Sequence, residues 1–120
     1  MSFQCEELLI NIKRQAKRLA KIMNSSLGHA QETLAICVYG CRNYGELISL
    51  VKSQDFNNSI LFLTALHPKA EIFLYKILSE NITNISERFV ANQIYFDKSH
   101  EKILMIFSVE LDDFERKISN

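Results

Sequence analysis

Proline, glycine and tryptophan are scarce in this chain of 120 residues, which has one proline, three glycines and no tryptophan. Because the turns between many short strands depend on glycine and proline, this scarcity favours long helices over an all-β architecture. Apolar residues make up 48% of the chain, enough for one core at a length typical of one domain. We therefore predict a single mainly α-helical domain, residues 1–120, built as a compact bundle of about six to seven helices.

An excess of charge of either sign is also missing, because 14 Lys and Arg balance 14 Asp and Glu. This balance argues against a protein that is held on nucleic acid by its bulk charge alone. The charge is nevertheless distributed unevenly. Residues 1–54 carry seven basic and four acidic side chains, whereas residues 55–120 carry seven basic and ten acidic ones. The two halves can therefore face partners of opposite charge.

Long apolar runs are absent as well, since none approaches the roughly 18 residues that are needed to span a bilayer. The chain starts with the acidic pair Glu6 and Glu7 instead of the apolar segment of a signal peptide. We therefore expect a small soluble protein that is cytoplasmic and does not bind a membrane.

The cysteines are Cys5, Cys37 and Cys41, an odd number that is typical of reduced thiols. Cys37 and Cys41 lie four residues apart, and His29 precedes Cys37 by eight, a spacing that can place soft metal ligands on one side of a helix. Gly40 is expected to interrupt that helix, however, and no fourth ligand is near. We therefore predict buried thiols, no metal site and no cofactor.

The spacing of apolar residues predicts helical segments at residues 4–23, 27–39, 44–53, 55–66, 68–79, 84–96 and 99–118. Ser26 and Asn43 are the expected N-caps of the second and third segments. Gly40 suits the end of the second segment, because glycine adopts the left-handed conformation at little cost.

The later boundaries depend on fewer signals. Pro68 suits the first position of the fifth segment, and Asn84 with Glu87 has the spacing of a capping box for the sixth. Residues 55–66 are apolar nearly all round, so we expect them at the centre of the bundle.

An alternative remains for the last third of the chain. Apolar and aromatic residues alternate near residues 89–110, which is also compatible with a β-hairpin and thus with an α+β fold. We favour helices, because Phe107, Leu111, Phe114 and Ile118 continue a helical spacing beyond any strand of that hairpin.

Residues 12–50 contain three short motifs, which read IKRQAKRL from Ile12, SLGHAQE from Ser26 and GCRNYGEL from Gly40. In this order they resemble the N-terminal helical module of uncharacterised and glyoxalase-related bacterial proteins, some of them carried on plasmids. Cys41 replaces an aromatic residue of that module, and Tyr44 replaces its tryptophan. The resemblance implies a three-helix start and a bacterial or mobile-element origin, but no activity.

The best candidate binding residues lie on the first predicted helix, where five cationic side chains form a stripe: Lys13, Arg14, Lys17, Arg18 and Lys21. Such a stripe can contact phosphates or an acidic protein surface. The following two helices, joined by a short turn, have the outline of a helix-turn-helix motif. The recognition helix of that motif would contain few residues that read bases.

A second candidate surface is acidic and consists of Glu110, Asp112, Asp113 and Glu115. It can form a docking surface for a basic partner, although the adjoining Arg116 and Lys117 make a solvated helix face the simpler interpretation.

Motifs of catalysis are missing, including the phosphate-binding glycine loop, the G-x-S-x-G elbow and the H-E-x-x-H zinc motif. We therefore expect a non-catalytic protein that docks onto a protein partner, for example as an inhibitor of a host defence or regulatory complex. The alternative is a helix-turn-helix-like DNA-binding regulator that uses the basic helix. Closure of the core in a homodimer is also possible for a helical chain of this size.

Overall fold

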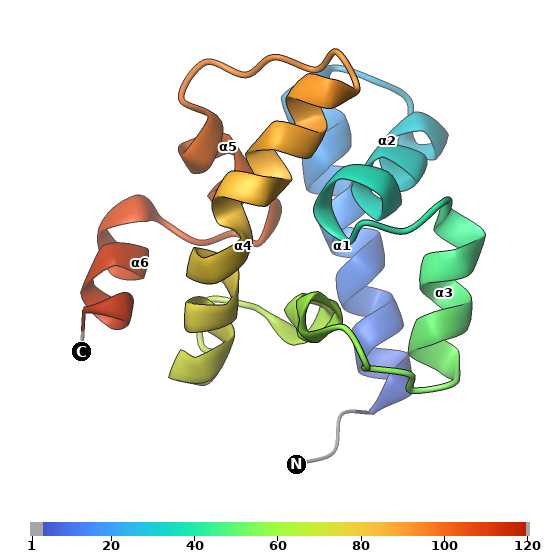
Figure 1. Ribbon diagram of the computed structural model, residues 1–120, viewed down its shortest axis with the longest axis horizontal. Helices are drawn as coiled ribbons and strands as arrows, with labels where there is room; N and C mark the ends of the chain where they lie inside the picture. The colour runs from blue at the N-terminus through green and yellow to red at the C-terminus, as the bar shows by residue number, and fades with distance from the viewer. Residues whose placement is uncertain (1–3, 120) are drawn as a thin grey trace.

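The computed structural model describes residues 4–119, which form the mainly α-helical bundle that the sequence predicts (Figure 1). Its elements are α1 (Cys5–Met23), α2 (Leu27–Thr33), the π-helical turn η1 (Leu34–Val38), α3 (Tyr44–Lys52), the 3-10 helix η2 (Ser59–Ala65), α4 (Ile72–Ala91), α5 (Ser99–Ile106) and α6 (Leu111–Ile118). In Figure 1, α3 and α6 lie at opposite edges of the molecule, with α1 and α4 between them.

Helix α1 packs against α2, α3, α5 and η2, which makes it the main support of the bundle. The spacing predicts an apolar stripe on this helix, of which Ile12, Ala16 and Leu19 are buried together with Leu8. The other expected members, Leu9, Ala20 and Met23, are half-buried. The helix ends at Asn24, which adopts the left-handed conformation and donates its backbone N–H to carbonyls of the last turn. The opposite side of α1 faces solvent and carries the cationic stripe.

The local signals around α2 and α3 are confirmed. The Ser26 hydroxyl accepts a hydrogen bond from the His29 N–H at 3.2 Å, and Asn43 Oδ1 accepts one from the Glu46 N–H at 2.8 Å. Gly40 has a φ of 68°, the left-handed conformation expected after a helix. Between α2 and Gly40 the chain widens into the π-helical turn η1, which the sequence does not predict.

A polar network crosses the core and joins three elements. The Tyr39 hydroxyl donates to Gln15 Oε1 at 2.5 Å, and Gln15 Nε2 donates to the Leu63 carbonyl at 3.2 Å. Gln15 and Tyr39 are 1% and 2% exposed, so this network supplies the hydrogen bonds that water would otherwise make to their polar groups.

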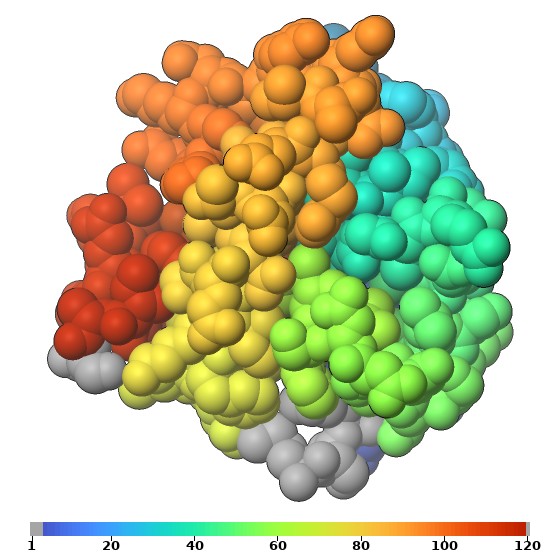
Figure 2. Space-filling model, viewed as in Figure 1, coloured from blue at the N-terminus to red at the C-terminus, as the bar shows by residue number. Residues whose placement is uncertain are grey.

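The expected boundary between residues 79 and 84 is wrong, because α4 continues without a break from Ile72 to Ala91. Its buried side includes Leu78, Ile82 and Ile85, and this stripe passes through the proposed capping box at Asn84. Packing of the stripe therefore overrides the capping signal. Figure 2 shows α4 lying between α6 on one side and η2 on the other.

Pro68 does not begin a helix either. It lies in a turn in which the Ala70 N–H donates to the His67 carbonyl at 2.9 Å, and α4 starts only at Ile72. Residues 60–66 are buried apart from the half-buried Phe62, as expected for a central segment, whereas residues 57–59 are exposed. Only Ser59–Ala65 is helical, and its geometry is 3-10.

The segment 99–118 is two helices instead of one. Phe107 and Val109 are both buried, and Ser108 between them has a φ of 58°, which redirects the chain so that both side chains reach the core. The alternative hairpin near residues 89–110 is wrong, since residues 4–119 contain no strand.

Candidate functional site

The five predicted cationic residues lie on the outer side of α1 in two groups. Arg14, Arg18 and Lys21 line hollows in the surface, whereas Lys13 and Lys17 are exposed and lie outside them. The helical periodicity accounts for this division, because it places the first group on the side of α1 that faces α5.

The first hollow has a volume of about 460 Å³ and lies between α1, the turn at residues 67–70 and Ser108. Arg14 and Arg18 line it together with Ile10, Asn11 and His67. Glu7 lies at its N-terminal end and is the only carboxylate in its lining among residues 4–119.

The second hollow has a volume of about 360 Å³ and lies between α1 and α5. Arg18 and Lys21 form its α1 side, and Lys102 and Met105 form its α5 side. Because Arg18 lines both hollows, they meet along α1, and we call them together the α1 groove.

The cations of the α1 groove form no ion pair among residues 4–119. Among residues 4–119, Arg42 pairs with Glu46, and Asp113 pairs with both Arg116 and Lys117. Arg14, Arg18, Lys21 and Lys102 take part in none of them. Four cations therefore share a groove that has one carboxylate at its end, and such a groove attracts an external anion.

Arg18 is the fixed member of this group. Its Nη1 donates to the carbonyl of Ile106, at the end of α5, at 3.0 Å. Burial and the nearby Arg14 charge both lower the pKa of the Arg18 guanidinium, which marks an environment that is short of negative charge.

The groove also exposes apolar surface. Ile10 of α1 is 48% exposed and Met105 of α5 is 47% exposed, and each lines one of the two hollows. The groove thus presents both cationic and apolar groups, a combination that suits a protein ligand.

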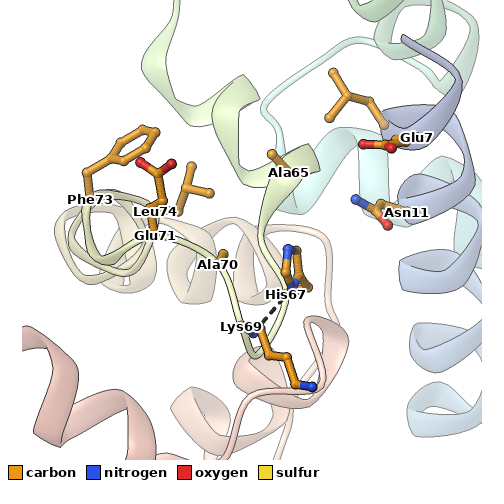
Figure 3. A pocket seen from close by; sticks show the side chains of 10 residues that line it. Glu7, Asn11, Ala65, His67, Lys69, Ala70, Glu71, Phe73 and Leu74 are labelled. Atoms are coloured by element: carbon orange, nitrogen blue, oxygen red, sulfur yellow. Dashed lines mark hydrogen bonds between the residues drawn. The ribbon is translucent and has the colours of Figure 1, made fainter. Parts of the chain in front are cut away.

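A further pocket of about 280 Å³ adjoins the groove, and Figure 3 shows its lining. We call it the His67 pocket. Five apolar residues line it: Leu8, Ala65, Ala70, Phe73 and Leu74. Glu7 and Asn11 on one side and Lys69 and Glu71 on the other add polar groups, with His67 between them (Figure 3). Glu7, Asn11 and His67 line both this pocket and the α1 groove.

Two hydrogen bonds hold the polar side chains where the pocket and the groove meet. His67 Nδ1 accepts from the Lys69 N–H at 3.2 Å, and Asn11 Nδ2 donates to the Thr64 carbonyl at 3.1 Å. A hydrogen bond from α4 holds the turn at residues 67–70, because the Tyr75 hydroxyl donates to the Pro68 carbonyl at 2.6 Å. The junction is therefore preorganised.

The predicted acidic residues lie on and before α6, and one of them has a structural contact. Asp113 pairs with Lys117 at 3.1 Å and also with Arg116, and these hydrogen bonds lower the pKa of its carboxyl. Lys117 also donates to the Pro68 carbonyl at 2.7 Å, so Asp113 helps to fix α6 on the bundle. Glu110, Asp112 and Glu115 are exposed and keep the prediction of an acidic surface open.

All three cysteines are free thiols, of which Cys37 and Cys41 are buried and Cys5 is partly buried. Cys37 is buried near the end of α4, and its Sγ donates to the Arg88 carbonyl at 3.7 Å. Burial raises the pKa of its thiol to about 11, so it stays protonated at neutral pH. Within residues 4–119, no three His, Cys, Asp or Glu side chains gather in a way that could hold a metal ion.

The predicted recognition helix, α3, lies apart from the groove, since none of its residues lines either hollow. Its exposed residues are Gly45, Ser49 and Lys52, and Glu46 is paired with Arg42. The basic groove and the helix-turn-helix outline thus do not form one surface.

Sequence reasoning missed the residues that complete the groove, notably Ile10, His67, Lys102 and Met105. Lys102 and Met105 lie three residues apart and therefore on one side of α5, which is a signal of a shared surface. Nothing in the sequence indicates that this side lies beside Arg18, which is more than 80 residues away along the chain.

No family model, curated protein or solved structure matches this chain. The resemblance of residues 12–50 to a bacterial helical module therefore stays a prediction. None of the helices over residues 4–119 combines the length and the apolar character needed to cross a bilayer.

Proposed function

We propose that this chain is a non-catalytic binding protein that docks onto an acidic segment of a protein partner through the α1 groove. The observation that carries the proposal is the set of four cations, Arg14, Arg18, Lys21 and Lys102, none of which has an ion-pair partner among residues 4–119. Inhibition of a host defence or regulatory complex in the cytoplasm is one role of this kind, and the three free thiols fit a reducing compartment.

A protein ligand fits the groove better than a nucleic acid does. Ile10 and Met105 are exposed in it, and the described residues that line it include no Phe, Tyr or Trp side chain, the larger rings on which bases stack. A DNA-binding regulator also needs α3 beside the basic surface, and α3 lies outside the groove. DNA binding is therefore the alternative, and the experiment has to distinguish it from binding of an acidic protein segment.

The experiment compares two variants that change the charge of α1 equally. Arg14→Glu with Lys21→Glu reverses two charges inside the groove, and Lys13→Glu with Lys17→Glu reverses two outside it. Fluorescently labelled poly-glutamate and a mixed-sequence DNA duplex serve as probes at about physiological salt, because salt screens the contacts of both.

We expect poly-glutamate to bind the native chain and to lose at least about tenfold in affinity in the groove variant, or 1.4 kcal/mol. The control variant should lose much less. Equal losses in both variants would show that total charge, and not the groove, determines binding. Tight DNA binding that weakens in both variants would favour the regulator.

A further inference from the structure

We infer that the partner segment of the α1 groove is an extended peptide with one apolar anchor residue at one end, seated in the His67 pocket, and acidic residues at alternate positions beyond it. This inference rests on the proposed function and adds the order, spacing and conformation of the segment.

The position of the anchor follows from the junction of the two sites. Glu7, Asn11 and His67 line both the pocket and the groove, so the two adjoin at these residues. The pocket is lined by five apolar side chains, among them Phe73 and Leu74, and its volume of about 280 Å³ suits one apolar side chain better than a larger group.

The order of the segment follows from the carboxylates. Glu7 and Glu71 both line the pocket, and Lys69 is the one Lys or Arg in its lining among residues 4–119. An acidic residue of the partner placed there would meet like charge, which lowers affinity. Beyond His67 the lining changes sign, because Arg14 and then Arg18 follow along α1. The apolar residue therefore lies at the end of the segment that reaches the pocket, and the acidic residues lie beyond His67.

The spacing of the acidic residues follows from helix geometry. Arg14 and Arg18 lie four residues apart, which is a rise of about 6 Å along α1. Two residues of an extended peptide cover about 6.6 Å. Acidic residues at every second position therefore meet successive cations of the groove, and the residues between them face away.

The extended conformation follows from the room available. Asn11 and Lys21 are ten residues apart, so the groove between them is about 15 Å long. A helix of this length and of about 10 Å diameter fills roughly 1,200 Å³. The two hollows have volumes of about 460 and 360 Å³, which suit the thinner extended chain.

The experiment measures the affinities of four labelled peptides with blocked ends. The first has a leucine followed by glutamates that alternate with serines. In the second, serine replaces the leucine. In the third, glutamate replaces the leucine. In the fourth, the leucine lies in the middle of the glutamates instead of at one end. The proteins are the native chain, Ala70→Leu, which fills the pocket without a change of charge, and Glu7→Gln with Glu71→Gln.

We expect the native chain to bind the leucine peptide at least about tenfold more tightly than the serine peptide, and Ala70→Leu to abolish this preference while binding of the serine peptide stays unchanged. In Glu7→Gln with Glu71→Gln, the peptide with glutamate at the anchor position should gain affinity. This second variant removes only surface charge, so it keeps the test valid if Ala70→Leu disturbs the fold.

The outcomes separate the two proposals. If no acidic peptide binds, or if binding survives in Arg14→Glu with Lys21→Glu, the proposed function fails. If all four peptides bind equally and all lose affinity in that groove variant, the proposed function stands and the anchored segment is overturned. Equal binding of the fourth peptide overturns the terminal position of the anchor. In a fifth peptide, proline replaces the serines of the first, and a tenfold loss of affinity would overturn the extended conformation.

Discussion

Cationic side chains have different surroundings in two regions of this molecule. At the π-helical turn, Arg88 lies against backbone, where its Nε donates to the Cys37 carbonyl at 2.8 Å and its Nη2 donates to the Val38 carbonyl at 3.0 Å. In the α1 groove, four cations line two adjoining hollows, and within residues 4–119 Arg18 is the one of them whose side chain has a hydrogen bond to the protein. In the first region, backbone carbonyls accept the hydrogen bonds of the cation. In the second region, positive charge remains available to a partner.

The comparison teaches that a cation whose donors are taken up by carbonyls of the chain supports the fold, whereas a cation without such acceptors, such as Arg14 or Lys21, is available to a partner. Arg88 and Lys117 donate to carbonyls, so their removal should affect stability. Arg14 and Lys21 should affect binding. The following predictions test this division, beginning with the largest expected change in the free energy of unfolding.

Arg88→Met should destabilise the chain most, by about 1–3 kcal/mol, because the two carbonyls at the end of η1 lose a charged donor. The value lies below that of a fully buried pair, since the guanidinium is partly exposed to solvent. Urea unfolding followed by circular dichroism measures the change. Lys76→Met, an exposed residue of α4, is the control, and an equal loss in both variants would contradict the role of Arg88.

Lys117→Met should cost less, on the order of 1 kcal/mol, because it removes the contacts with the Pro68 carbonyl and the Tyr75 hydroxyl at a more exposed site. The Nζ atom also lies 4.4 Å from the centre of the Tyr75 ring, which adds a cation–π contact. Amide hydrogen exchange should become faster in α6 and remain unchanged in α1. Faster exchange throughout the chain would show that Lys117 supports the whole fold.

The Asp113 contacts predict a pH dependence of smaller size. Hydrogen bonds from Lys117 and Arg116 lower the pKa of the Asp113 carboxyl. Its contribution to stability is therefore complete above the ordinary carboxyl pKa of about 3.8 and fades as the pH falls through the lowered value. Asp113→Asn should thus be less stable than the native chain at pH 6 and equally stable in strong acid. Asp112→Asn, whose carboxylate makes no ion pair in residues 4–119, should match the native chain throughout.

Arg14→Met should change stability least, by no more than about 0.5 kcal/mol, because it removes an exposed charge and no hydrogen bond to the chain. The same variant should weaken poly-glutamate binding. A stability loss as large as that of Arg88→Met would end the distinction between the two regions.

Local chemistry predicts the fold well where a residue acts on its own neighbours. Ser26, Gly40 and Asn43 all have their expected roles, and the apolar stripe of α1 faces the core as its spacing requires. The predicted helix boundaries are wrong where tertiary packing determines them. The buried stripe carries α4 through Asn84, and the burial of both Phe107 and Val109 divides the last helix.

The candidate site divides in the same way. The cationic half of the groove could be predicted, because Arg14, Arg18 and Lys21 are neighbours on one helix. The other half could not, since Lys102 and Met105 of α5 reach the groove only through the docking of α5 on α1. The acidic surface shows a different kind of error. The sequence predicts Asp113 as part of an exposed acidic surface, but its carboxylate forms an ion pair with Lys117 of the same helix.

The buried pair of Gln15 and Tyr39 has a spectroscopic consequence. Since the chain has no tryptophan, its near-ultraviolet spectrum comes mainly from four tyrosines. Tyr39 is buried with its hydroxyl bonded to Gln15, and burial raises the pKa of that hydroxyl, whereas Tyr95 is 72% exposed. During an alkaline titration, Tyr39 should therefore ionise, and its tyrosinate absorbance should appear, only when the bundle unfolds. A late, abrupt rise in that absorbance provides an intrinsic signal of the moment at which α1, η1 and η2 separate, without any added dye or engineered probe.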